Sequence, residues 1–158
     1  FDWPSNHFGD YGKIGVWTAD SGGSNQDAYL LTTHEFNAAG TSFFGAAFIA
    51  FERDAMLSGA PTAKMVRFPG FDAYGVEPVN LIGTLNAPAN ACPFFVHFDS
   101  GTSDYKFWDT CLNWTTPANS TVSTNPQLVP GSPFAPLGDP VAPPRTPSPP
   151  ATFSPHVM

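Results

Sequence analysis

The sequence predicts an all-β protein built from antiparallel four-stranded meanders. Two apolar segments rich in strand-favouring and aromatic residues, Asp27–Phe36 and Ser42–Phe51, flank a run of turn formers at Asn37–Thr41. Aromatic residues make up 15% of the 158 residues, which is enough for a substantial core. The links between successive apolar segments are short, whereas parallel pairing needs a crossover of about a dozen residues or more.

Four strands are expected in the first part of the chain. The first is Ile14–Asp20, and the aromatic segment before it, Phe1–Asp10, would have its strand partner outside this sequence. The two segments of the central pair follow, and Ala63–Phe68 is the fourth strand. Before that fourth strand, Asp54 as N-cap and Gly59 as the residue after the C-cap predict one helical turn.

A second meander is expected to follow. Val79–Leu85 has the composition of a strand, and Pro93–Asp99 faces Tyr105–Trp114 across a four-residue loop. Gln127–Val129 would add a short outer strand. The two meanders together account for most of the chain before the proline-rich end.

The two cysteines are candidates for a disulfide. If Ser100–Ser103 forms the hairpin loop, Cys92 lies opposite Cys111, at a separation that a bridge can span. The alternative is two buried free thiols, which protein cores tolerate. The sequons that begin at Asn113 and Asn119 are candidate glycosylation sites and fit a secreted protein, although ordinary Thr-rich strand ends would produce the same matches.

The composition changes from Pro126 onward. Most of the 18 prolines lie in this last part, and proline lacks the amide donor that an inner strand needs. We therefore expect a folded region at residues 1–137 and a proline-rich, extended or disordered tail at residues 138–158. The tail is either a linker or a PxxP-type ligand.

Charge and hydropathy argue against two classes of partner. Six basic and thirteen acidic residues give a net charge of −7, which disfavours nucleic acid and anionic membranes. No segment approaches the roughly 18 apolar residues of a membrane helix. The chain begins at Phe1 without a signal-like segment, which we interpret as a mature product or an excised piece of an extracellular or periplasmic protein.

An ordered set of motifs resembles a known group of proteins. The motifs are Tyr11–Trp17 (YGKIGVW), Asp27–Thr33 with Glu35-Phe36, Ala50–Gly59, Lys106–Trp108 and Asn113–Thr121. The set is similar to a family of secreted, mostly bacterial, β-propeller-like proteins of unassigned function. In that family a proline stands where this chain has Gly12, and the first two motifs are contiguous, so we interpret Thr18–Gln26 as a loop insertion.

The resemblance covers roughly residues 8 to 136. It implies an internal piece of a propeller with two blades, at about residues 8–70 and 78–130. A blade is apolar on both faces because it is sandwiched between neighbours, so a two-blade piece would leave two faces uncovered. We therefore expect contact with the missing blades or self-association.

The chain lacks the motifs of nucleophilic, phosphate-binding and metal sites. His34 and Glu35 are neighbours in a strand, so their side chains should point to opposite faces and cannot share a metal. The other histidines, His7, His97 and His156, have no metal-ligand spacing. We therefore expect no cofactor and no metal.

Three carboxylates are candidate binding residues: Asp27, Asp99 and Asp104. Asp27 follows the flexible loop Ser21–Gln26, which is the first place to look for function. Asp99 and Asp104 bracket a hydroxyl-rich turn that lacks the ligand order of a calcium loop and resembles an ordinary solvated hairpin.

Two functions are compatible with these observations. The first is an extracellular, non-catalytic, propeller-like binding or structural module with a protein or glycan partner, and we favour it over an enzyme. The second is a fragment of a carbohydrate-active hydrolase whose remaining carboxylates lie outside this chain. Clustering of Asp27, Glu35 or Asp99 within about 10 Å would favour the hydrolase, because glycosidase carboxylates lie ~5–9.5 Å apart. Scattered acids would favour the binding module.

Overall fold

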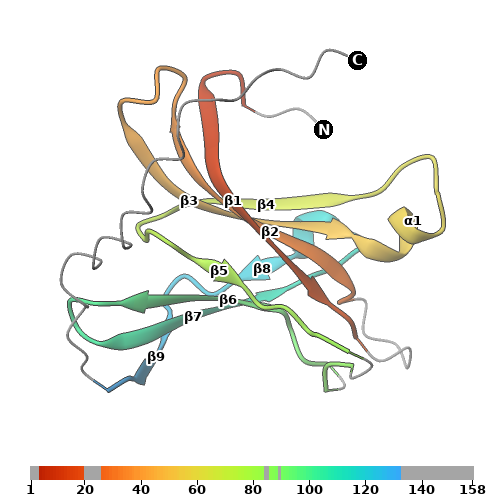
Figure 1. The fold of residues 1–158 in the computed structure, drawn as a ribbon. Coiled ribbons are helices and arrows are strands. Elements are labelled where there is room, and N and C mark those ends of the chain that lie inside the picture. Colours follow the sequence, from red (N-terminus) through yellow and green to blue (C-terminus); the bar gives the residue numbers. More distant parts are fainter. Residues whose placement is uncertain (1–3, 20–25, 84–85, 89, 133–158) are drawn as a thin grey trace, which may run out of the picture.

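The predicted fold class is confirmed: the chain is all-β, with two antiparallel sheets (Figure 1). The structure is a computed structural model that describes residues 4–19, 26–83, 86–88 and 90–132. The predicted tail at residues 138–158 and most of the Ser21–Gln26 loop lie outside the described residues. The first sheet is a meander in the order β1 (His7–Trp17), β2 (Ala28–Asn37), β3 (Phe43–Glu52) and β4 (Met65–Phe71).

The second sheet is also antiparallel and follows the first along the chain. In it, β7 lies between β6 on one side and both β8 and β9 on the other. Its strands are β5 (Glu77–Pro78), β6 (Phe94–Asp99), β7 (Asp104–Cys111), β8 (Thr121–Val122) and β9 (Gln127–Pro130). The outer strand expected at Gln127–Val129 is therefore present as β9.

Two expectations about strands are wrong. Strand β1 begins at His7, which pairs with Asn37, so the partner of residues 7 to 10 lies within this chain. Of the strand expected at Val79–Leu85, the last two residues lie outside the described residues, and the part from Val79 to Gly83 does not continue β5. Instead, the Val79 N–H donates to the Phe94 carbonyl (3.0 Å) and the Leu81 N–H donates to the Val16 carbonyl (2.8 Å), so this segment joins the two sheets.

The expected helical turn is present as α1 (Arg53–Leu57). It begins one residue before Asp54, and its N-cap is Glu52 rather than Asp54. A short 3₁₀ turn, η1 (Pro117–Asn119), precedes β8. Within the described residues, no helix has the length and apolarity needed to cross a membrane.

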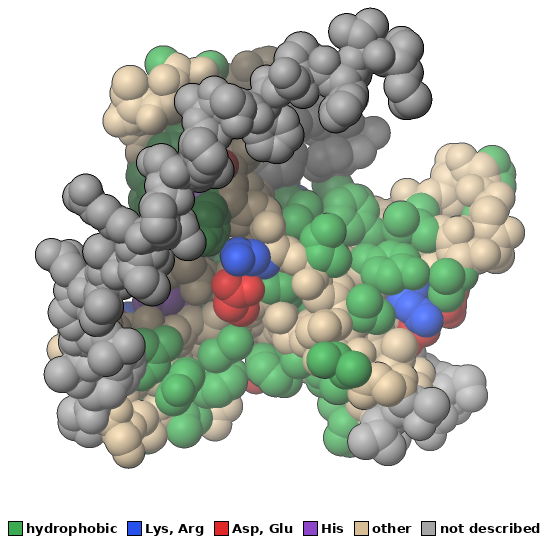
Figure 2. Space-filling model, viewed as in Figure 1, with side chains coloured by type: hydrophobic (Ala, Val, Ile, Leu, Met, Phe, Trp, Pro, Cys, Tyr) green, Lys and Arg blue, Asp and Glu red, His purple; other side chains and the backbone are tan. Residues whose placement is uncertain are grey.

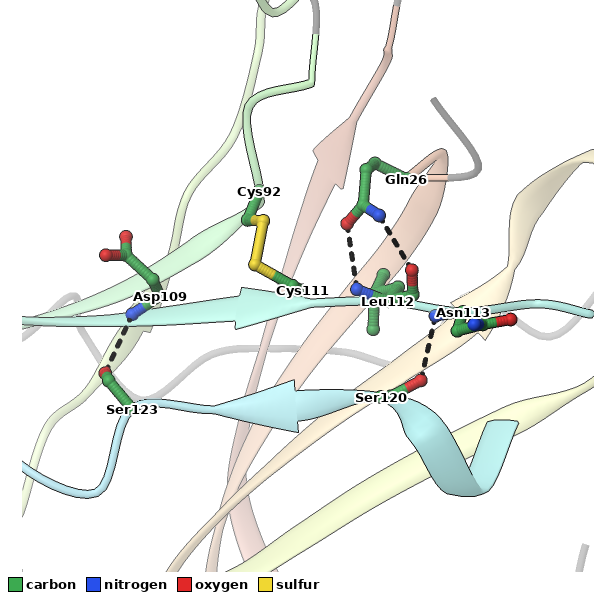
Figure 3. Close-up of a disulfide and its surroundings, with 8 residues drawn as sticks. All are labelled: Gln26, Cys92, Asp109, Cys111, Leu112, Asn113, Ser120 and Ser123. Carbon is green, nitrogen blue, oxygen red and sulfur yellow. Dashed lines mark hydrogen bonds between the residues drawn. A yellow bond between two sulfur atoms is a disulfide. The ribbon is translucent and has the colours of Figure 1, made fainter. Parts of the chain in front are cut away.

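The β6–β7 hairpin has the predicted register, with Phe95 opposite Trp108 and His97 opposite Lys106. The predicted disulfide is also confirmed: Cys92 is bonded to Cys111, and their Cα atoms are 4.8 Å apart (Figure 3). Next to the bridge, the Gln26 side chain donates to the Leu112 carbonyl and accepts from the Leu112 N–H. This pair of hydrogen bonds ties the start of β2 to the end of β7.

The core lies between the two sheets. Phe48 of β3 is fully buried, and its ring stacks on Phe71 (centroids 4.0 Å apart) and on Phe95 of the second sheet (4.4 Å). Trp108 meets the Phe48 ring edge-on at 5.6 Å. Burial of each such side chain contributes about 1.5–3 kcal/mol, so this aromatic stack holds the sheets face to face.

The first strands of the two sheets lie side by side. Gly15 of β1 makes this possible, because a Cβ at that position would lie 2.2 Å from the carbonyl oxygen of Val79. The Asn80 side chain accepts from the Val16 N–H at 3.1 Å and closes the same contact. The two sheets are therefore in close contact where β1 meets the residues that immediately follow β5.

Both sheets also carry apolar side chains on the faces turned away from the core. On the first sheet, Ile14 is 75% exposed and Met56 of α1 is 49% exposed. They line a shallow apolar depression of about 290 Å³ together with Tyr29, Leu31 and Phe51. Figure 2 shows hydrophobic side chains gathered over the first sheet beside α1.

The corresponding face of the second sheet carries aromatic and aliphatic side chains. Tyr105 is 42% exposed there, and its ring packs against Phe98 (centroids 5.0 Å) and Phe107 (6.4 Å). Val129 of β9 pairs with Tyr105 and is 42% exposed. Both sheets of the molecule thus present an apolar face that the chain's own core does not use.

Candidate functional site

Asp27 immediately precedes β2, and its hydrogen bonds hold the start of that strand in place. Its carboxylate accepts from the Arg53 guanidinium at 3.0 Å and from the Ala19 N–H. Its carbonyl accepts from the indole N–H of Trp114 at 2.9 Å. Burial, and after it the nearby Asp27 carboxylate, raises the pKa of Asp54. Asp27 therefore holds several segments together, and its side chain is already engaged.

Asp99 and Asp104 pair with each other at the end of the β6–β7 hairpin. The Asp99 carboxylate binds the Lys106 ammonium at 2.6 Å and accepts from the Gly101 N–H at 2.9 Å. The hydrogen bond from Lys106, followed by that from Gly101, lowers the pKa of Asp99. Among the residues that the structure describes, no three His, Cys, Asp or Glu side chains are grouped to hold a metal ion.

The acids proposed for a hydrolase do not form one pair. Asp27 and Glu35 are eight residues apart along an extended strand, which separates them by about 26 Å. Asp99 lies in the second sheet, whereas Glu35 lies on the face of the first sheet that is turned away from it. The first sheet therefore stands between these two carboxylates.

Glu35 is instead the centre of a buried ionic cluster, and it is only 1% exposed. The Arg67 guanidinium from β4 donates to both carboxylate oxygens, with Nε at 3.0 Å from Oε1. His7 Nδ1 lies 3.2 Å from Oε2. As predicted, His34 points to the opposite face of β2, where it contacts Gly75 and Tyr74.

The face that carries His34 forms a cleft lined by aromatic rings. Asp10 pairs with His34 and Lys13 pairs with Thr32, so Tyr11 and Gly12 together oppose a single residue of β2. This is a β-bulge, which bends a strand and redirects a side chain. Tyr11 has a φ of 57°, a left-handed conformation that is uncommon for a residue other than glycine.

Three rings meet around His34. Tyr11 stacks parallel to the imidazole, with centroids 5.7 Å apart, and Tyr74 from the β4–β5 link lies at 4.1 Å. Phe43 of β3 packs against both His34 (5.9 Å) and Tyr74 (4.7 Å). His34 is 7% exposed, whereas Tyr11 and Tyr74 are 63% and 56% exposed. Two accessible tyrosines therefore surround a buried histidine.

The hydrogen bond to Gly75 determines the protonation of His34. Nε2 accepts from the Gly75 N–H at 2.9 Å, so in the neutral ring the proton is on Nδ1. Burial lowers the pKa of His34, and the nearby Asp10 carboxylate opposes this shift. The imidazole is therefore neutral near pH 7, and Nδ1–H has no hydrogen-bond partner among the described residues.

Two charged groups flank the cleft. Asp10 is exposed, and its Oδ1 accepts from the Tyr11 N–H at 2.7 Å. The Lys13 ammonium lies over the Tyr11 ring, 4.8 Å from its centroid. The cleft encloses about 420 Å³ and is lined by Asp10, Tyr11, His34, Tyr74 and Gly75. Figure 1 shows that the start of β1, the end of β2 and the start of β3 extend away from the second sheet. Asp10 pairs with His34 in this part of the first sheet.

Sequence reasoning did not identify the cleft. Tyr11 belongs to the YGKIGVW motif, but its exposure follows from the bulge, which the motif does not reveal. Tyr74 lies in a link between sheets, and a long-range contact brings it to His34. The one sequence signal for this part of the cleft is the Tyr74-Gly75 pair, because a glycine in a loop often marks a left-handed turn. The structure has such a conformation at Gly75, with a φ of 67°.

The two sequons differ in accessibility. Asn119 is exposed in η1, whereas Asn113 is half-buried and its Oδ1 accepts from the Thr116 N–H at 2.8 Å. The Asn113 N–H donates to Ser120 Oγ (2.9 Å; Figure 3). Glycosylation at either asparagine stays a prediction.

Comparison of the chain with protein-family models, curated proteins and solved structures gave no significant match. The resemblance to the propeller-like family therefore stays a prediction from the motifs.

Proposed function

We propose that the chain is an extracellular, non-catalytic, propeller-like module that binds partners and assembles with further sheets of its own kind. The observation that carries this proposal is the arrangement of the two sheets. The first strands of the sheets lie side by side, and each sheet has an apolar face that the core leaves uncovered. Consecutive propeller blades also lie next to one another around a central channel, and their apolar faces need neighbouring blades to cover them.

The chemistry of the described residues supports binding rather than catalysis. Asp27, Glu35 and Asp99 are each engaged by a basic side chain, so none is poised as the acid or base of a hydrolase. The hydrolase alternative needs carboxylates from outside this sequence. The Cys92–Cys111 bridge supports an oxidising, extracellular location.

The outer faces indicate the partner, which we take to be a second copy of this chain. An apolar sheet face is stable when it packs on another, as Phe48 and Phe95 do inside the molecule. Each outer face exposes a large hydrophobic side chain, Ile14 on the first sheet and Tyr105 on the second. One copy can therefore stack its outer face on that of the next. Such an assembly would remove the exposed apolar surface from water.

Sedimentation velocity over a wide range of protein concentration tests this proposal. We expect the wild type to sediment as a dimer or larger species and Ile14→Lys to shift it to the monomer, because a charge would be buried in the contact. Ile82→Lys is the matched control, because Ile82 is 83% exposed in the link after β5 and lies outside the apolar depression. A wild type that remains monomeric at every concentration and binds no hydrophobic dye would refute the proposal.

A further inference from the structure

We infer that the cleft formed by Asp10, Tyr11, His34, Tyr74 and Gly75 is a carbohydrate site that binds one pyranose ring of a neutral oligosaccharide. The inference assigns a ligand class to a surface that lies apart from the apolar depression beside α1. It does not depend on whether the sheets assemble with further copies, since the lining residues are different.

The lining of the cleft suits a sugar ring. A pyranose has faces of C–H groups and a rim of hydroxyls, so it needs exposed aromatic surface together with hydrogen-bonding groups of both kinds. Tyr11 and Tyr74 supply accessible rings that each end in a hydroxyl. The second oxygen of the Asp10 carboxylate can accept from sugar hydroxyls, and His34 Nδ1–H can donate. A volume of about 420 Å³ lies within the range of small-molecule sites.

The charges around the cleft favour a neutral ligand. A cationic ligand would be repelled by the Lys13 ammonium, which lies 4.8 Å from the Tyr11 ring centroid. An anionic ligand would meet the Asp10 carboxylate and a chain whose net charge is −7. The imidazole of His34 adds no charge, because its Nε2 accepts the Gly75 N–H. A ligand without charge meets neither penalty.

The backbone of Tyr11 supports the same assignment. A left-handed conformation is unfavourable for a residue other than glycine, and glycine would relieve most of the strain. The bulge at Tyr11 places its ring parallel to His34, on the exposed side of the cleft. The Tyr11 side chain therefore contributes an exposed ring to the cleft, whereas its backbone conformation lowers the stability of the fold. A residue that lowers stability while it shapes a surface is typical of a binding site.

Isothermal titration calorimetry with oligosaccharides of β-linked glucose, xylose, mannose and N-acetylglucosamine tests the inference. We expect the wild type to bind at least one of these four. Tyr11→Gly and Tyr74→Ala should each weaken that binding about tenfold, because each removes an aromatic contact with the sugar. Tyr11→Gly should at the same time raise the midpoint of thermal unfolding, so its loss of binding cannot be attributed to unfolding.

Tyr105→Ala is the matched control, because Tyr105 is an exposed tyrosine on the second sheet and should not affect the affinity for the sugar. Failure of the wild type to bind any of the four oligosaccharides would overturn the inference, and so would equal binding by wild type, Tyr11→Gly and Tyr74→Ala. Sedimentation of Tyr74→Ala should match that of the wild type. A failure of the sugar site is thereby distinguished from a failure of the proposed assembly.

Discussion

His34 shows how a single residue can set the character of a binding surface. The Gly75 N–H needs an acceptor, and only an imidazole that is unprotonated at Nε2 supplies it. Protonation would place two donors opposite each other in a site that is already poorly solvated. The neutral form is thus favoured by burial and by the hydrogen bond to Gly75, while Asp10 opposes them.

His34→Gln should make stability less dependent on pH. The pKa of His34 is lowered in the folded state from its ordinary value of 6.5, so below that value the unfolded chain binds more protons than the folded chain. The stability due to neutral His34 is fully present above pH 6.5 and is lost as the pH falls toward the lowered pKa. Urea unfolding on both sides of pH 6.5 measures the effect. The prediction would be contradicted if the free energy of unfolding changed with pH equally in the wild type and the variant.

At the scale of the strands, the first sheet is tied together on its outer face by an ion pair. Arg67 of β4 reaches across β3 to Glu35 of β2, and His7 of β1 joins from the other side. The cluster therefore links three strands through one buried carboxylate. A buried charge of this kind is stable only while its partners are present.

Glu35→Ala should lower the free energy of unfolding by about 3–5 kcal/mol, because the buried Arg67 would lose its counter-charge. Chemical denaturation compared with the wild type measures the loss. Glu77→Ala is the matched control, since Glu77 forms an exposed pair with Lys13 at 3.9 Å and such pairs contribute about 0–1 kcal/mol. If both variants lost the same free energy of unfolding, Glu35 would contribute no more than an exposed surface charge does.

The elements differ in how well the sequence predicts them. The β6–β7 hairpin could be predicted with its register, because a short loop and alternating side chains determine which residues pair. The early start of β1 was missed because its partner, Asn37, is distant in sequence, and β8 was missed because Thr121-Val122 is too short to show a strand pattern. The ion pairs of Asp27 and Asp99 could not be predicted, because the sequence does not show which bases, here Arg53 and Lys106, reach them. Ligand binding at these acids stays a prediction.

For the whole molecule, the contact between the two sheets depends on a very close backbone approach. The aromatic stack of Phe48, Phe71 and Phe95 supplies apolar contact in the middle of the core. At the edge, Gly15 lets the chain after β5 lie directly against β1. The alignment of the sheets, and with it the projecting end that carries the cleft, could not be predicted from either meander alone.

Gly15→Ala should destabilise the protein by about 3 kcal/mol, because the new methyl group would overlap the backbone of Val79, which cannot rotate away. Gly12→Ala is the matched control in the same strand, because its methyl group would lie 3.4 Å from the end of the Leu31 side chain. Urea unfolding of the two variants measures the difference. A Gly15→Ala protein as stable as Gly12→Ala would show that the sheets can separate slightly at this edge.

The bridge between Cys92 and Cys111 turns the β6–β7 hairpin into a covalent ring that includes the exposed residues Gly101 and Thr102. A protease that cuts this turn cannot release either half, because the sulfur–sulfur bond still joins them. The nicked chain would run at full length on a denaturing gel until a reductant is added. After a single cleavage in this turn, the two strands of the hairpin therefore stay covalently joined, whereas an unbridged hairpin would be cut into two separate chains.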